Sequence, residues 1–140
     1  MKMVSFNSRP PTMKRPGTLS IAVPASQAKV ALPTMEGYLF RPVSSILYME
    51  AEGNYTKIFF SDGAQELICR TLRSVQELIG NYAQFVRVHR SYTVNIDHMD
   101  KYIRGKGGFI VMDGGKEISV SNSKKEALTQ AISRHFGAKI

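Results

Sequence analysis

Three short polar segments of the sequence carry side chains that suit the phosphates and base edges of nucleic acid. They are residues 52–57 (EGNYTK), 87–92 (RVHRSY) and 121–125 (SNSKK). The guanidinium of Arg90 can donate two hydrogen bonds to guanine O6 and N7, and the amide of Asn54 or Asn122 can pair with adenine N6 and N7. Lysine and serine side chains suit phosphate oxygens, which set the register of a bound protein without reading sequence. The residue types therefore favour nucleic-acid binding.

The second segment closes a predicted strand in which apolar and cationic residues alternate. Side chains alternate between the two faces of a strand, so Val86 and Val88 should share one face, with Arg87 and His89 on the other. A polar turn follows these residues. The pattern predicts a surface that presents cations, an imidazole and a hydroxyl together.

The third segment opens a predicted helix. The first N–H groups of a helix have no partner within it and carry a partial positive charge, which attracts anions. Lys124 and Lys125 add full positive charges at a place where cations weaken the helix. This conflict favours a functional interpretation, with a solvated helix start as the alternative.

Short β-strands separated by turn residues dominate the chain from Gly37 onward. Asp62-Gly63 and Asp113-Gly114-Gly115 are hairpin signals because glycine accepts a positive φ, and residues 105–108 (GKGG) read as a further hairpin loop. The pattern predicts a sandwich-like, mainly β body with two short helices. The predicted strands are Tyr38–Phe40, Ile46–Glu50, Tyr55–Phe60, Glu66–Cys69, Val86–Val88, Tyr92–Val94, Lys101–Arg104, Phe109–Met112 and Glu117–Val120.

Two amphipathic stretches interrupt these strands. Thr71 should cap a helix that presents Leu72, Val75, Leu78 and Ile79 on one face and ends at Gly80. The second helix should begin at Ser121 or Ser123, and Ser123 with Glu126 fits a capping box. Its predicted buried stripe is Ala127, Leu128, Ala131 and Ile132.

Charge and proline content divide the chain near residue 35. The 140 residues carry a net charge of +8, which favours a polyanionic partner. Residues 1–35 hold five cations and no acid, and all six prolines lie at or before Pro42. Residues 1–35 are therefore predicted to form a flexible basic arm and 36–140 the folded domain, with a short strand over Ser20–Val23 or Lys29–Leu32 docking on its edge. The arm would add non-specific DNA affinity; a plain disordered terminus is the favoured alternative.

Cys69 is the one cysteine, which leaves no intrachain disulfide and no cysteine-based metal site. Its apolar neighbours indicate a small core residue. No run of about 18 apolar residues and no secretory signal occur, so we expect a cytoplasmic protein without membrane insertion. Nothing in the sequence calls for a cofactor.

The order of four blocks resembles the LytTR family of bacterial DNA-binding domains. The blocks are residues 46–55 (ILYMEAEGNY), 70–72 (RTL), 85–95 (FVRVHRSYTVN) and 119–121 (SVS). The resemblance implies an elongated, multi-sheet β fold of LytTR type that regulates transcription by inserting loops into successive major grooves of duplex DNA. It also suggests two copies on paired half-sites. Residues 1–36 are too few for the receiver domain that often precedes such a domain, so the input signal is not expected within this chain.

The resemblance implies base or backbone contacts from Asn54 or Tyr55, from His89 and Arg90, and from Ser121 and Asn122. Family members commonly carry arginine where this chain has Asn122, which predicts a shift from guanine to adenine at that contact, or weaker binding. With the cations and hydroxyls around them, the candidate DNA-binding residues are Asn54, Tyr55, Lys57, Arg87, His89, Arg90, Ser91, Ser121, Asn122, Ser123, Lys124 and Lys125.

Two other classes of function compete with DNA binding. An enzyme could use His89, His98 and His135 with nearby acids, but no pair has metal-ligand spacing and no nucleophile turn occurs, so we expect no catalytic activity. His98 and His135 read as turn and surface residues. A non-DNA module could instead bind an anionic protein or membrane surface through its basic clusters. Sequence preference that survives competitor DNA separates the first class from both others.

Overall fold

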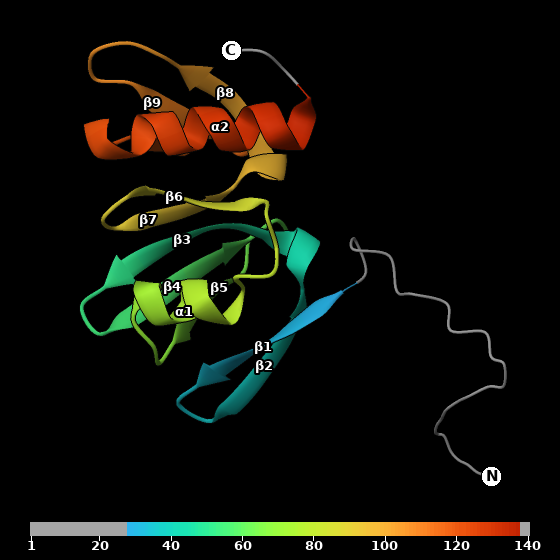
Figure 1. Ribbon diagram of the computed structural model, residues 1–140. Helices are drawn as coiled ribbons and strands as arrows, with labels where there is room; N and C mark the ends of the chain where they lie inside the picture. Colours follow the sequence, from blue (N-terminus) through green and yellow to red (C-terminus); the bar gives the residue numbers. More distant parts are fainter. Residues whose placement is uncertain (1–27, 138–140) are drawn as a thin grey trace, which may run out of the picture.

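A computed structural model describes residues 28–137, which form three antiparallel sheets and two helices stacked into an elongated body (Figure 1). The central sheet has the strand order β5-β4-β3-β7-β6. Its strands are β3 (Ile46–Glu52), β4 (Tyr55–Phe60), β5 (Gln65–Ile68), β6 (Phe85–His89) and β7 (Tyr92–Asn95). The mainly β fold with two helices is therefore confirmed.

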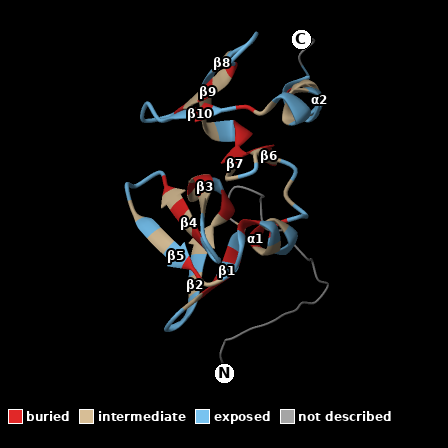
Figure 2. Cartoon of the chain, turned by 90° about the vertical axis from the view of Figure 1, so that its left-hand side faces the viewer, coloured by how far each residue is buried: buried red, intermediate tan, exposed pale blue. Residues whose placement is uncertain are grey.

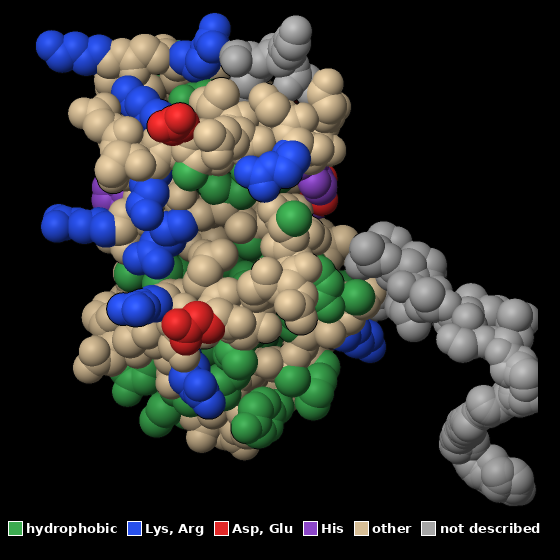
Figure 3. All heavy atoms as spheres, in the orientation of Figure 1, with side chains coloured by type: hydrophobic (Ala, Val, Ile, Leu, Met, Phe, Trp, Pro, Cys, Tyr) green, Lys and Arg blue, Asp and Glu red, His purple; other side chains and the backbone are tan. Residues whose placement is uncertain are grey.

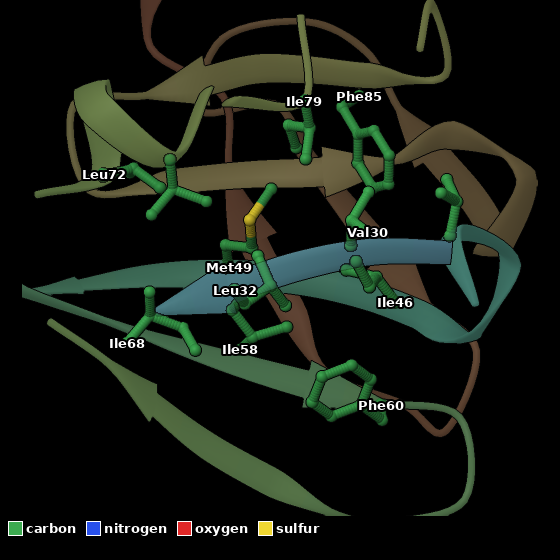
Figure 4. Packing of buried hydrophobic residues seen from close by; sticks show 12 residues of the cluster. Val30, Leu32, Ile46, Met49, Ile58, Phe60, Ile68, Leu72, Ile79 and Phe85 are labelled. Atoms are coloured by element: carbon green, nitrogen blue, oxygen red, sulfur yellow. The ribbon is translucent and has the colours of Figure 1, made fainter. Parts of the chain in front are cut away.

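One face of the central sheet packs against β1 (Lys29–Thr34) and α1 (Leu72–Leu78). β1 pairs in antiparallel fashion with β2 (Gly37–Pro42). Figure 4 shows Leu32 of β1 lying over Met49 and Ile58 of the sheet, and none of the three side chains is exposed. Fully burying a side chain of this size contributes about 1.5–3 kcal/mol, so β1 is part of the folded domain.

A second core lies on the other side of the central sheet. It is covered by the sheet β10-β9-β8 and by α2 (Lys125–Phe136). The three strands are β8 (Met99–Ile103), β9 (Phe109–Met112) and β10 (Glu117–Ser119). Tyr48, Val88, Ile110, Ile118 and Leu128 come together here. A register shift between Ile46 and Tyr48 helps β3 to serve both cores, because Ile46 and Met49 join the first core and Tyr48 the second.

All nine predicted strands are present as β2 to β10, with ends that differ by a few residues. The strand proposed over Lys29–Leu32 is also present, so the folded domain begins before the predicted boundary at residue 35. Pairing with β2 and the burial of Val30 and Leu32 account for this extension. The alternative strand over Ser20–Val23 lies outside the described residues.

The three glycine-rich turns are confirmed. Gly63 has φ +91°, and the Asp62 carboxylate accepts a hydrogen bond from the Ala64 N–H at 2.9 Å. Gly114 and Gly115 have φ of +94° and +97° in the β9–β10 turn. Residues 105–108 form the β8–β9 loop. A side chain at position 108 would place its Cβ 2.9 Å from the Ile103 carbonyl oxygen, so the tight approach requires glycine.

Both predicted helices form, with corrections at their ends and faces. The Thr71 side chain caps α1 as predicted, accepting from the Ser74 N–H at 3.2 Å. Leu78 is 47% exposed, because the short helix turns that side chain away from the sheet. The predicted capping box at Ser123 is wrong: α2 begins at Lys125, follows a 3-10 turn over Asn122–Lys124, and has no side-chain cap.

The predicted environments of Ala127 and Cys69 also need correction. In α2, Leu128 and Ile132 are buried, whereas Ala127 is exposed. Cys69 is half-buried where its chain passes β1, and its N–H donates to the Pro33 carbonyl at 3.0 Å. Among residues 28–137, no helix has the length and apolar character needed to cross a bilayer.

Candidate nucleic-acid interface

The three polar segments lie along one edge of the molecule. Glu50 and Glu52 at the end of β3 pair with Tyr92 at the start of β7 and with Tyr55 at the start of β4. Antiparallel pairing therefore brings the β3–β4 turn and the β6–β7 turn to the same end of the sheet. α2 begins on this side as well, at the left of Figure 1, and Figure 2 views the edge face-on, with its turns largely exposed.

The first segment is a two-residue hairpin turn, Gly53-Asn54. Gly53 has φ +61°, which allows the tight turn and leaves Asn54 at its tip. Asn54 and Tyr55 are exposed, and neither side chain bonds to another residue that the structure describes. Lys57 lies 3.8 Å from the Glu52 carboxylate, so its charge is partly neutralised within the segment.

The second segment forms the β6–β7 turn, and hydrogen bonds fix its backbone. Nε of Arg87 donates to the His89 carbonyl at 2.9 Å, and its Nη2 donates to the Arg90 carbonyl at 2.6 Å. The Ser91 carbonyl accepts from the Ala51 N–H at 2.8 Å, which ties the turn to β3. The Arg90 side chain is exposed and has no partner within residues 28–137.

His89 is held in one orientation by the same turn. The Ser91 N–H donates to His89 Nδ1 at 3.1 Å, and the ring packs edge-on against Tyr92 with centroids 5.8 Å apart. When Nδ1 accepts, the neutral ring carries its proton on Nε2. His89 is then a hydrogen-bond donor through Nε2.

A β-bulge connects the second and third segments. The register shifts between Arg87 and His89, which frees the Val88 carbonyl from the β6–β7 pairing. The N–H of Ser121 donates to this carbonyl at 2.9 Å, and its hydroxyl oxygen lies 3.3 Å away. The start of the third segment is therefore fixed to the turn that carries His89 and Arg90.

The third segment carries two further unpartnered polar side chains. Asn122 and Ser123 are exposed and form no side-chain bond with the described part of the chain. Nζ of Lys125 donates to the Gly105 carbonyl at 2.8 Å, which draws the β8–β9 loop toward the start of α2. This contact adds the exposed Lys106 to the edge, a residue that sequence reasoning assigned only to a hairpin loop. A lysine between glycines in a predicted loop was the available signal.

Two other residues of the 85–95 block stabilise the fold. The Asn95 amide is fully buried, donates to the Ile46 carbonyl at 2.8 Å and accepts from the Asp97 N–H at 3.0 Å. The Tyr92 hydroxyl donates to Glu50 at 2.9 Å. Burial and this hydrogen bond raise the pKa of Tyr92 to about 12, so the hydroxyl keeps its proton at neutral pH.

Cations gather along this edge, as the blue side chains at the left of Figure 3 show. Two nearby acids already have partners in the protein: Glu52 pairs with Lys57, and Glu50 accepts a hydrogen bond from Tyr92. Such a surface is complementary to a polyanion.

The three histidines have separate partners. His98 Nε2 lies 2.6 Å from the Ser44 carbonyl, and His135 Nε2 lies 2.6 Å from the Asp97 carboxylate, so neither of these contacts involves the His89 turn. His98 ends a 3-10 turn and His135 is exposed on α2, as predicted. Residues 28–137 contain no cluster of three or more His, Cys, Asp or Glu arranged to hold a metal ion.

Comparison with known proteins agrees with this architecture. The family model described as the LytTr DNA-binding domain matches residues 36–133. The CO-responsive transcriptional regulator RcoM of Rhodospirillum rubrum is 34% identical over 95 residues, which cover 67% of this chain and 39% of that protein. A LytTr DNA-binding domain from Bacillus cereus matches in structure with a TM-score of 0.64 and 24% identity, over 76% of this chain and 97% of that one. The chain therefore belongs to the LytTR family of DNA-binding domains.

Proposed function

We propose that this domain binds duplex DNA in a sequence-specific manner, by inserting the three segments of its polar edge into the major groove, and that it thereby regulates transcription in a bacterial cytoplasm. The proposal rests on one observation. The exposed side chains of Asn54, Arg90 and Asn122 lie on three neighbouring turns of one edge, and none bonds to another described residue. These side-chain types can make paired hydrogen bonds to a base edge.

The candidate residues divide into base-reading and backbone-binding groups. Asn54, Arg90 and Asn122 are free to meet bases, and the fixed Nε2–H of His89 can donate to a base acceptor or a phosphate oxygen. Hydroxyls and cations around them suit the phosphate backbone, where they hold the register of the complex. This second group comprises Tyr55, Lys57, Ser91, Ser121, Ser123, Lys124, Lys125 and the added Lys106.

The proposal also covers the number of copies on DNA and the role of the N-terminal basic segment. Two copies on paired half-sites would double the contacted length and match the symmetry of many operators. The match covers 39% of RcoM, so it supports DNA binding by this chain and does not extend the CO response of that regulator to it. The basic segment that precedes β1 would add salt-sensitive affinity without changing the sequence that is read.

Selection of bound sites from random duplex DNA tests the proposal. The chain should enrich one motif, and that motif should be unchanged when residues 1–27 are deleted, since this deletion spares β1. The shortened chain should bind more weakly at low salt because it retains fewer cations. Enrichment of no motif, or binding to anionic vesicles that excess duplex DNA does not compete away, would favour the alternative of a module for other anionic partners.

A further inference from the structure

The Arg87 guanidinium lies against the backbone of the turn that carries His89 and Arg90. Its Nε and Nη2 donate to the His89 and Arg90 carbonyls at 2.9 and 2.6 Å. Neighbouring residues partly bury the group, and this burial lowers the pKa of Arg87 from its ordinary value. An arginine remains a cation in such surroundings.

The β6–β7 turn needs hydrogen bonds from outside the strand pairing, because this pairing is interrupted beside the turn. The register shift between Arg87 and His89 takes Val88 out of the pairing, and the Val88 carbonyl bonds to Ser121 instead. The carbonyls of His89 and Arg90 then point toward Arg87, while the Ser91 N–H holds the His89 ring. One guanidinium therefore holds the backbone both before and after the Arg90 side chain.

We propose that Arg87 is a positioning residue for DNA recognition: it sets the conformation of the β6–β7 turn and thereby the directions of the His89 ring and the Arg90 side chain. This inference rests on the proposed DNA-binding function and replaces the direct DNA contact expected for Arg87 from sequence. The guanidinium bonds the two carbonyls through two different nitrogens, whose N–H directions are fixed by its plane, whereas the three donors of a lysine ammonium share one nitrogen. Lysine should therefore fail to replace Arg87, although it keeps the charge.

The test compares wild type, Arg87→Lys and Arg87→Gln on the selected duplex and on a scrambled duplex, at several salt concentrations. Both variants should lose about tenfold in affinity on the selected duplex, the size of one lost base contact, with little change on the scrambled one. The slope of log affinity against log salt should differ from wild type by much less than the value of about 0.9 that one phosphate contributes. Arg134→Lys serves as the matched control and should bind like wild type, because Arg134 is exposed in the last turn of α2, at the end of the helix away from the edge.

A direct phosphate contact from Arg87 would give a different pair of results. If Arg87→Lys binds like wild type, and Arg87→Gln weakens both duplexes with a slope reduced by about 0.9, Arg87 contacts phosphate directly and the inference is wrong.

A measurement without DNA separates this inference from the proposed function. In ¹⁵N spectra of the wild-type chain, neutral His89 should carry its proton on Nε2, and the Ser91 amide should exchange slowly. In both Arg87 variants the Ser91 amide should exchange faster, with the remaining fold intact by circular dichroism. A proton on Nδ1 in wild type, or unchanged exchange in the variants, would overturn the inference even if DNA binding is confirmed. Absence of any sequence preference in wild type would instead contradict the proposed function.

Discussion

Replacement of Arg90 by alanine should weaken binding to the selected duplex by about 1–3 kcal/mol, which corresponds to a loss of roughly 5- to 150-fold. The Arg90 side chain projects from the β6–β7 turn with no partner in the described part of the chain, so its donors are available to a base. Its backbone carbonyl, which holds Arg87, remains in the alanine variant. Affinity for a scrambled duplex should change much less, and the fold should be intact by circular dichroism.

The control for this variant is Arg134→Ala, which removes an exposed arginine in the last turn of α2, at the end of the helix away from the edge. A surface substitution outside the interface has little effect, so both the stability and the DNA affinity of the control should resemble wild type. Equal losses on the selected and scrambled duplexes after Arg90→Ala would assign Arg90 to phosphate binding.

Asn122→Arg should shift the preferred base at one position of the site toward guanine and leave the other positions alone. An asparagine amide pairs with adenine, whereas arginine donates to guanine O6 and N7. Asn122→Ala should relax the same position to indifference, at a cost of about 1 kcal/mol or more. Site selection with each variant gives the comparison directly. An unshifted motif for Asn122→Arg would contradict the assignment of Asn122 to a base contact.

The rival role for Asn122 is capping of the last helix, and the structure gives it little support. The 3-10 turn begins at Asn122 without a side-chain cap, and α2 begins three residues later at Lys125. Asn122→Ala should therefore leave the melting temperature close to that of wild type. Asn81→Arg, at an exposed position in the connection from α1 to β6, controls for the added charge and should not alter the motif.

Local signals in the sequence predicted most of the fold. Alternating residues mark the strands, and the Asp-Gly turns and the Thr71 cap act over two or three residues, so neighbours in sequence specify them. Asn54, Arg90 and Asn122 were predicted from their paired hydrogen-bonding groups and from the family resemblance, and all three residues are exposed in the structure. The common edge of the three segments, in contrast, follows from the antiparallel pairing of Glu50 with Tyr92 and of Glu52 with Tyr55.

The features that could not be predicted depend on contacts between distant segments. The Val88 carbonyl meets Ser121, 33 residues later, and the Lys125 ammonium meets Gly105 across the β8–β9 loop. The contact of the Arg87 guanidinium with the turn carbonyls depends on the bulge, which strand alternation does not reveal. The helix start at Lys125 differs from the predicted cap because the 3-10 turn precedes it.

The most direct test of sequence-specific binding by this edge is a titration of the wild-type chain with the selected and the scrambled duplex at increasing salt. Both affinities should fall linearly on a log–log plot, with a slope of about −0.9 for each phosphate neutralised. The selected duplex should remain the tighter ligand throughout, because hydrogen bonds to bases release no condensed counterions. Affinity that does not respond to salt, or the same affinity for both duplexes, would contradict the account.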